Sequence, residues 1–552
     1  MIRPLAVITL GFTLAITLAG GETGNDAFNT LIGKVIAREN GLLTVLRAAH
    51  PIAETYIQEM GKDADFGFVP TTDHYFLGKV DLSHGVATDS LIPKSSVKTR
   101  AFDVFTQLFS ARFLPRGFAQ MMLVDGSGFD RAHYDFQFVR REFLGDLRTW
   151  EIEVTPLKSA GPGHFNGRIW VEDKTFSIVR FSGTYGQGLT QHYLHFDSWR
   201  VNAGPDLWVP SQIYSEEADM QFGMALRKVH FKAITQLWGY TRDEDRNKEE
   251  FTSMSVEMPS VVDHSEQAAD YSPVESLRNW KRQSEDNILN RLERANVMGP
   301  AGEVEKVLDT VVNNLVVTNN LQIVPEVRTR VILTTPLETF TVGHTIVISR
   351  GLLDTLPDEA SLAAMLAHEL AHIALGHDVD TKFAFGDLLN FSDEQLLRKF
   401  RFASSPEQEE AANQKCMEFL QKSPYADKMK EAGLFLKALG AESSRLPYLI
   451  KPLTGDRLAN GNQVLRLAAL LQTAPQLQPT RTDQIAALPL GTRTKLDPWT
   501  DQLRMAHTRT TPLLSPGEKM PFEIAPVFLH LTYQSAPGVG QEPVVTTAPP
   551  IQ

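Results

Sequence analysis

The chain has 552 residues, of which 42% are hydrophobic and 22% are charged. This length exceeds what one hydrophobic core supports, so we expect two or three folded domains rather than a disordered chain. The formal net charge of -12 argues against nucleic acid as a partner, because the chain would repel a polyanion. The single cysteine, Cys416, excludes an internal disulfide and a cysteine-rich zinc cluster.

The first 21 residues have the pattern of an export signal. Arg3 supplies a positive charge, residues 4–19 are almost wholly apolar, and small residues follow at 19–21. We therefore predict a signal peptide over 1–21 and an exported protein, periplasmic or extracellular, of a bacterial envelope. The alternative is an uncleaved membrane anchor, for which the apolar run is slightly short.

A helical pattern over about 22–62 opens a predicted β-rich domain that covers 22–240. Apolar and polar residues then alternate, as at Tyr134 and Phe136, and residues 168–181 (RIWVEDKTFSIVRF) are typical of two strands around a turn. Such strands predict a mostly antiparallel sheet with one covered face. A helix followed by a sheet built around this hairpin resembles the LolA-type lipoprotein carriers and their half-barrel. The resemblance implies membrane or lipoprotein association through this domain; an accessory domain without a ligand is the alternative.

Residues 241–302 are predicted to be a linker followed by a helix. The linker, 241–270, is polar and charged, and the helix begins after Ser272, with Glu275 placed to complete its N-terminal cap. The Pro/Gly/Thr-rich residues 535–552 are predicted to be a disordered tail.

The most informative motif is HELAH, which lies within the apolar segment AMLAHELAHIALGH. His368 and His372 are four residues apart, so their imidazoles project from one helix face and can share one metal ion. Glu369 lies about 100° around the helix, beside that ion. In this HExxH arrangement the histidines bind zinc and the glutamate deprotonates a water molecule.

The context of the motif separates it from a chance match. Asp358 is placed to begin the motif helix and Gly376 to end it, so we expect HExxH to sit late in a helix with its own start and stop. A chance match has no reason to occur in such a context.

A zinc site of this kind needs a third protein ligand. A metzincin would have a glycine and a histidine where this chain has Leu375 and Asp378, so that class is excluded. The segment 405–408 (SPEQ) predicts the start of a later helix, with Glu409 in its first turn. A solvated acidic turn, favoured by the helix dipole, is the alternative for Glu409.

Three stretches, ISRGLLDTL, DEASLAAMLAHELAHIALGH and SPEQEEAAN, together resemble the gluzincins of metallopeptidase family forty-eight, which include HtpX, BepA and the CAAX prenyl protease. The resemblance spans about 303–420. It implies one zinc ion per chain, held by His368, His372 and Glu409, and it implies that Glu369 is the catalytic base. It further implies that the substrates are proteins or peptides.

The same resemblance implies an edge strand near 339–348 that pairs with the substrate backbone. The chain also departs from the family at three positions. Asn413 stands where the family has an aspartate, which would accept the other N–H of a ligand histidine and raise its basicity. Gln478 and Gln484 stand where a histidine and an arginine are expected, so the group that stabilises the oxyanion stays unassigned.

The sequence therefore predicts an α+β protein: an antiparallel β-rich, half-barrel-like domain followed by a mainly helical zincin domain with a small sheet over 303–510. The leading hypothesis is an exported zinc-dependent endopeptidase that acts in envelope protein quality control. One alternative is a catalytically weakened, protease-like chaperone or carrier of lipoproteins or apolar ligands. Another is a protease held latent by its β-rich domain.

Overall fold

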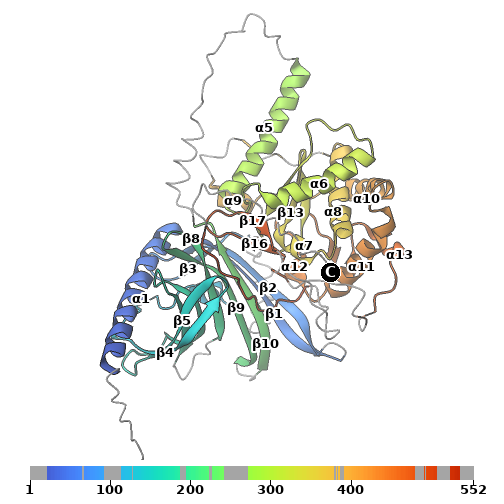
Figure 1. The fold of residues 1–552 in the computed structure, drawn as a ribbon. Coiled ribbons are helices and arrows are strands. Elements are labelled where there is room, and N and C mark those ends of the chain that lie inside the picture. Colours follow the sequence, from blue (N-terminus) through green and yellow to red (C-terminus); the bar gives the residue numbers. More distant parts are fainter. Residues whose placement is uncertain are drawn as a thin grey trace, which may run out of the picture.

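The computed structural model describes residues 21–534, apart from 65–66, 93–112, 127, 187–193, 223–226, 241–271, 378–380, 382, 386–390, 479–480, 482–489, 492 and 507–521. Residues 1–20 of the predicted signal peptide, the predicted linker at 241–270, the predicted tail at 535–552 and Gln484 lie outside the described residues. The predicted α+β class is confirmed, since a large antiparallel sheet precedes a helical region that holds a small sheet (Figure 1).

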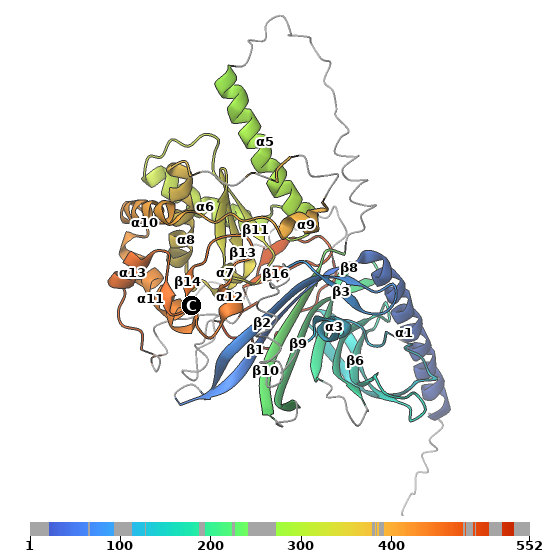
Figure 2. The ribbon, with the colours of Figure 1, turned by 180° about the vertical axis from the view of Figure 1, so that it is seen from behind.

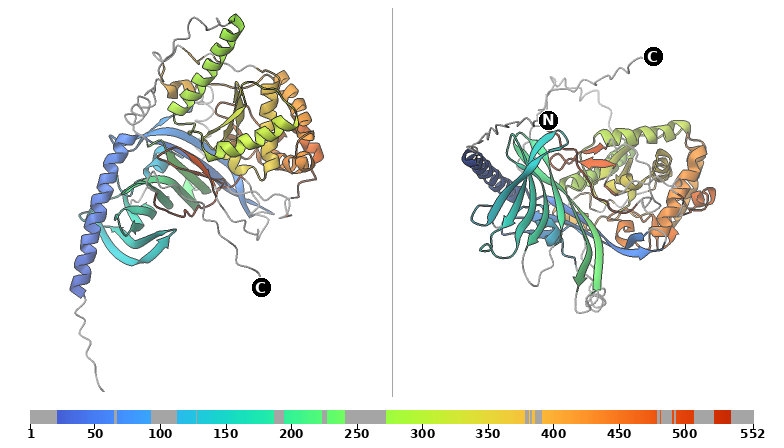
Figure 3. Two further views of the ribbon diagram at one scale, coloured as in Figure 1. Left: turned by 45° about the horizontal axis from the view of Figure 1, so that its top comes forward. Right: turned by 60° about the horizontal axis from the view of Figure 1, so that its bottom comes forward.

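The N-terminal sheet has ten strands in the order β3-β2-β1-β10-β9-β8-β7-β6-β5-β4, and each neighbouring pair is antiparallel. β1 and β10 are the first and the last strands of this sheet in chain order, and they pair with each other in its interior. The predicted hairpin at 168–181 is confirmed as β6 and β7, with Trp170 opposite Arg180. Figure 3 shows how strongly the sheet curves. The strands are β1 Ile52–Asp63, β2 Gly67–Asp81, β3 Ala87–Ser90, β4 Tyr134–Leu144, β5 Leu147–Pro156, β6 His164–Glu172, β7 Ile178–Gly186, β8 Phe196–Gly204, β9 Leu207–Phe222 and β10 Arg227–Trp238.

Helices α1 (Gly21–Ala49) and α3 (Pro115–Gln120) cover one face of this sheet. The apolar residues of α1 recur at helical spacing, as Leu31, Val35, Leu42 and Leu46, and they are buried against the sheet. The sheet side of this core is filled by aromatic rings that are fully buried, namely Phe165, Phe181, Phe196 and Phe231. In the described part of the chain, no helix combines the length and the apolar composition that a membrane span requires.

The predicted helix over 22–62 is wrong in its last third. The helix ends at Ala49, His50 takes the left-handed backbone conformation (φ 43°), and Pro51 cannot continue a helix. Residues Ile52–Asp63 instead form β1, which pairs with β2 on one side and β10 on the other. The first nine residues of β1 are all buried, so the alternation typical of a half-exposed strand is missing from its sequence.

The second region carries a three-stranded sheet, in the order β11-β13-β12, and the helices that surround it (Figure 2). The predicted start of α5 is confirmed, because the Ser272 side chain accepts a hydrogen bond from the Glu275 amide. The helices are α5 Pro273–Arg294, α6 Glu303–Thr318, α7 Arg350–Thr355, α8 Glu359–Ala374, α9 Asp393–Leu397, α10 Pro406–Gln421, α11 Met429–Glu442, α12 Pro447–Ile450 and α13 Ala468–Thr473, with a 3-10 turn at Ala426–Lys428. The strands are β11 Arg328–Ile332, β12 Thr339–Val342, β13 Thr345–Ser349, β14 Ala459–Asn460, β15 Gln463–Val464, β16 Thr494–Leu496 and β17 Leu503–Met505.

The two regions share one hydrophobic core and a buried polar network. Glu54 of β1 accepts hydrogen bonds from the amide and the hydroxyl of Thr335, at 2.6 and 2.8 Å, and pairs with Arg350. Asp73 of β2 accepts from the amide of Tyr448 at 2.9 Å. The shared core includes the sheet residues Ile52, Tyr56, Tyr75, Leu77, Leu91, Ile234 and Trp238. These contacts hold β1, β2 and β10 against the helical region.

Candidate metal centre

The motif helix has the limits that the sequence predicts. The Asp358 side chain accepts a hydrogen bond from the Ser361 amide at 2.7 Å and caps the first turn of α8. At the other end, Gly376 has φ 69°, a left-handed conformation that glycine adopts without steric cost. His368, Glu369 and His372 therefore lie in the second half of a well-defined helix.

The second predicted helix also begins where expected. The hydroxyl of Ser405 accepts from the amide of Gln408 at 3.3 Å, and the Gln408 side chain accepts from the amide of Ser405 at 2.9 Å. This reciprocal cap, with Pro406 in the first turn, fixes the start of α10. It places Glu409 in the turn that faces α8.

The three predicted ligands converge. Glu409 Oε2 lies 3.3 Å from His368 Nε2, and Glu409 Oε1 lies 3.4 Å from His372 Nε2. The two Nε2 atoms are 3.2 Å apart. Ligand atoms about 2.0–2.1 Å from a tetrahedral zinc ion stand about 3.3 Å from each other. The three separations therefore fit one zinc ion bound by two imidazoles and one carboxylate.

The protonation states also suit a cation. Both histidines are almost fully buried, and burial lowers the pKa of His368, which keeps its imidazole neutral and its lone pair available. Burial alone would raise the pKa of Glu409. Hydrogen bonds with His368 and His372 and the positive charge of Arg466 outweigh that effect and hold this pKa well below its usual range. The donor set is thus two imidazoles and one carboxylate, a combination that zinc binds.

His372 is oriented by groups on its other nitrogen. His377 Nδ1 lies 2.9 Å from His372 Nδ1, and the hydroxyl of Ser404 lies 3.4 Å from the same atom. The amide of His377 donates to the His372 carbonyl at the end of α8. Its ring in addition contacts a ligand histidine, which makes it part of the site.

The structure adds a buried arginine that the sequence analysis missed. Arg466 is 3% exposed and donates from Nη1 to Glu369 Oε1 at 2.7 Å. Its Nε and Nη2 donate to the two carboxylate oxygens of Glu409, both at 3.1 Å, and Nη2 also donates to Asp456 at 3.2 Å. One guanidinium therefore links the predicted base to the predicted third ligand.

A signal for Arg466 was present in the sequence. Residues 466–470 read RLAAL, whereas the stretch at 484–488 that was compared with the family reads QIAAL. The arginine expected from the family pattern thus occurs earlier in the chain, and nothing in the local sequence shows that it folds back onto α8 and α10.

Asn413 has a different role from the one expected. Its Oδ1 accepts a hydrogen bond from the amide of Leu467 at 2.8 Å. Leu467 follows Arg466 in the chain and has φ 58°, so this bond fixes the backbone next to Arg466. The expectation that residue 413 holds the N–H of a ligand histidine is therefore wrong here. Because an amide oxygen accepts a backbone hydrogen bond as well as a carboxylate does, the change from aspartate removes no contact.

The predicted edge strand is confirmed as β12, while the remainder of 339–348 belongs to the central strand β13. The hydroxyl of Thr339 donates to Glu369 Oε1 at 2.6 Å. Residues 454–456 lie against this strand: Glu338 accepts from the Gly455 amide at 2.8 Å, and a Cβ at residue 455 would stand 2.9 Å from the Thr339 carbonyl oxygen. The segment 454–456 therefore lies against the first residues of β12.

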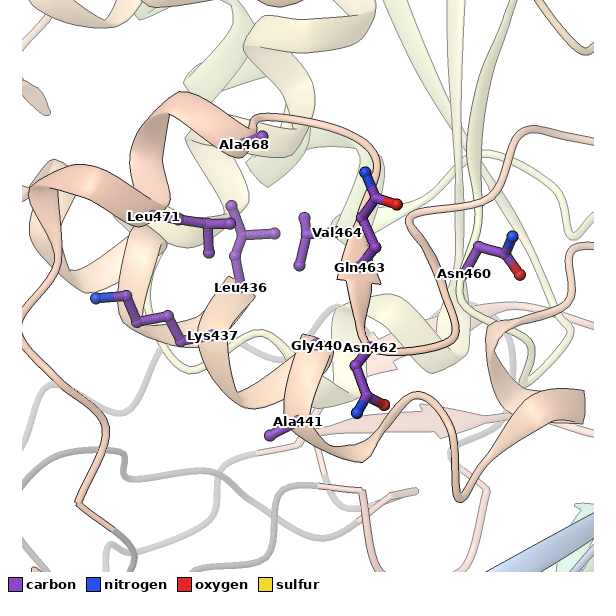
Figure 4. A pocket seen from close by; sticks show the side chains of 10 residues that line it. All are labelled: Leu436, Lys437, Gly440, Ala441, Asn460, Asn462, Gln463, Val464, Ala468 and Leu471. Carbon is purple, nitrogen blue, oxygen red and sulfur yellow. The ribbon is translucent and has the colours of Figure 1, made fainter.

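Two cavities flank the site. One, of about 790 Å³, lies between α11, α13 and the β14–β15 hairpin, and Figure 4 shows Leu436, Val464 and Leu471 facing into it. None of the three predicted ligands lines it. The other, of about 650 Å³, lies between β1, β2 and the segment 451–457, and Asp456 forms part of its wall. Asp456, in the wall of this second cavity, accepts a hydrogen bond from Arg466.

Two histidines and a glutamate in HExxH order on one helix, with a second glutamate from a later helix, have the arrangement expected of a metallopeptidase. Residues 305–398 match the model of peptidase family M48, so this segment of the chain is similar to that family of metallopeptidases. The matched residues include α8 and end before α10.

Solved structures also resemble the chain. A LolA superfamily protein from Nitrosomonas europaea is 10% identical, covers 37% of this chain and 90% of its own, and gives a TM-score of 0.18. A domain assigned as an outer membrane lipoprotein-sorting protein from Vibrio parahaemolyticus is 9% identical, covers 40% of this chain and 98% of its own, and gives a TM-score of 0.20. These scores carry no conclusion about function. A search of the curated proteins found no match.

Proposed function

We propose that the chain is a zinc-dependent endopeptidase that hydrolyses peptide bonds in proteins. The observation that supports this most strongly is the convergence of His368, His372 and Glu409, whose ligand atoms lie 3.2–3.4 Å apart. Two buried imidazoles and a partly buried carboxylate at tetrahedral spacing are a donor set that zinc binds. A zinc ion held there would supply Lewis acidity, which lowers the pKa of water and polarises the scissile carbonyl.

Glu369 is the proposed general base. It is 1% exposed, belongs to the same helix turn as His368, and therefore borders the ion without binding it. Its carboxylate accepts the proton of the attacking water and passes it to the leaving amine. The hydroxyl of Thr339 holds Oε1 of this carboxylate in place.

Arg466 is the group that we propose for charge stabilisation. Its guanidinium contacts both Glu369 and Glu409, so it lies beside the position where negative charge develops on the carbonyl oxygen. A fixed cation in a buried site stabilises such charge more than water does. Arg466 thus takes the role that could not be assigned from Gln478 and Gln484.

The finer parts of the proposal concern location and substrates. The predicted export signal supports an envelope protein, and the family resemblance supports unfolded or misassembled proteins as substrates. Envelope protein quality control is therefore the biological role that we propose. The segment at 454–456 favours a latent state in which a substrate strand displaces it from β12.

A weakened, protease-like carrier is the alternative. Asn413, Gln478 and Gln484 motivate it, and the hydrogen bond to the Leu467 amide accounts for the first of them. The aromatic rings under α1 also fill the described part of the face that would hold an apolar ligand. Zinc content separates the alternatives, because a carrier without a working site binds no stoichiometric zinc after supplementation.

Glu369→Gln tests the enzymatic proposal. We expect it to keep zinc and to lower casein cleavage by about 10²–10⁴-fold, the usual contribution of a general base. Glu410→Gln is a matched control, since Glu410 is exposed and contacts only Gln414 among the partners the structure describes. Full activity of Glu369→Gln in a clean preparation would reject the mechanism.

A further inference from the structure

The first half of α5 projects from the helical region (Figure 1). It carries large apolar side chains that are exposed to solvent. Val274 is 59% exposed, Leu277 70% and Trp280 59%. The second half of the same helix is held in the core by Ile288, Leu289 and Leu292. The exposed half is therefore the free end of an anchored helix.

The exposed apolar residues share one side of α5 with basic residues. Val274, Leu277 and Trp280 follow one another at intervals of three residues, so they lie within about 120° of the helix circumference. Two basic residues lie within or next to this sector, namely Lys281 and Arg278. The opposite side carries Glu275, Asn279 and Gln283.

This end of α5 is positive, although the whole chain has a formal net charge of -12. The pKa of His344, in the turn between β12 and β13, responds to these nearby positive charges. Burial and then the charges of Lys281, Arg282 and Arg328 lower its pKa. Trp280 stacks on Phe385 with ring centroids 4.4 Å apart, which fixes the ring at the surface without covering it.

We propose that the exposed half of α5 docks on an anionic lipid surface. The apolar residues would enter the interface between head groups and acyl chains, where tryptophan is favoured, and the flanking cations would contact lipid phosphates. Two and a half turns cannot span a bilayer but can lie on one. Charge complementarity selects a lipid surface over an apolar protein groove, because two cations, Arg278 and Lys281, border a narrow apolar stripe.

Docking would place the candidate metal centre near the membrane. The turn between β12 and β13 packs on α5, since a Cβ at Gly343 would overlap the carboxylate of Glu285. The edge strand β12 begins beside Glu369 and ends at this turn. The inference does not rest on the proposed peptidase activity, because it needs only the surface of α5.

Vesicle flotation of the full chain tests the proposal. We expect binding to vesicles of phosphatidylglycerol and phosphatidylcholine and weaker binding to phosphatidylcholine alone, with a decrease at high salt. Leu277→Glu should weaken binding by about tenfold or more, through the lost burial of a leucine. Arg278→Gln should weaken it about fivefold, the effect of about 1 kcal/mol per cation. Val317→Glu is the matched control, because Val317 is 72% exposed on α6, away from this stripe.

A fluorophore on Leu277→Cys gives a second measurement, since the native Cys416 is buried. We expect a blue shift when anionic vesicles are added and quenching by iodide before they are added. The proposal is overturned by equal binding to neutral and anionic vesicles, by unchanged binding of Leu277→Glu, or by a dye already shielded without vesicles. The last result would mean that the protein covers this stripe itself.

Discussion

Replacing Arg466 with methionine tests how the site is held together. The side chain donates to Glu369 at 2.7 Å, to both oxygens of Glu409 at 3.1 Å and to Asp456 at 3.2 Å, and it is 3% exposed. Methionine keeps much of the volume and removes every one of these hydrogen bonds. Three carboxylates then share a buried site without their common cation.

The structure gives two separate magnitudes for Arg466→Met. Removing one partner of a buried ion pair costs about 3–5 kcal/mol of folding free energy, and zinc bound to Glu409 would move the cost toward the lower value. If the guanidinium also stabilises the developing oxyanion, its loss lowers kcat by about 10²–10³-fold. Comparing kcat with the free energy of unfolding separates these effects, because a purely structural role changes stability and leaves kcat of the folded enzyme unchanged.

The assay combines urea unfolding with single-turnover cleavage of a fluorogenic peptide by zinc-loaded protein. Arg457→Met is the control, since Arg457 is exposed and hydrogen-bonds to Asn460 rather than to a site residue. Arg466→Lys should recover little activity, because an ammonium group cannot form the paired contacts to Glu409. A variant Arg466→Met that unfolds at lower urea but keeps kcat within about threefold of the native value would refute the catalytic role.

Three further predictions follow from the contacts. His377→Ala should weaken zinc binding by about 10–100-fold, because it removes a group that orients His372, and a chelator competition measures this. Asn413→Asp should leave kcat/KM nearly unchanged, whereas Asn413→Ala should lower the free energy of unfolding by about 1–2 kcal/mol through the lost bond to the Leu467 amide, as measured by urea unfolding. Burial raises the pKa of Asp73 to about 6, so the folded state binds more protons than the unfolded state between about pH 4 and 6. The stability that Asp73 contributes is therefore complete below about pH 4 and is lost as the pH rises to about 6. The loss in the free energy of unfolding is about 2–3 kcal/mol, at 1.36 kcal/mol per unit of pKa difference. Asp73→Asn should remove this part of the pH dependence in unfolding measured at each pH.

Local signals made much of the site predictable. Asp358, Gly376 and the 405–408 cap fix the limits of α8 and α10 through bonds that span three or four residues, so the sequence contains all the information needed. The HExxH spacing then places two imidazoles on one face of α8. The convergence with Glu409 agrees with the family resemblance, which supplied that ligand.

The parts that sequence analysis missed depend on contacts between distant residues. The sequence predicts a helix where the chain forms β1. Polar residues of β1, such as Glu54, are buried by partners almost three hundred residues away, and no local pattern shows those partners. Arg466 reaches Glu369 from 97 residues further along the chain, and Asn413 acts through a backbone amide that no pattern shows. The shared core between sheet and helical region likewise appears only in the folded chain.

The most direct test of the three-ligand site is the zinc content of purified full-length protein after dialysis against a weak chelator. We expect one zinc ion per chain in the native protein and in Glu369→Gln, and a strong loss in Glu409→Ala, while the exposed neighbour variant Glu410→Ala keeps its ion. Zinc retained by Glu409→Ala with native affinity, or no zinc in the native protein after supplementation, would contradict the account.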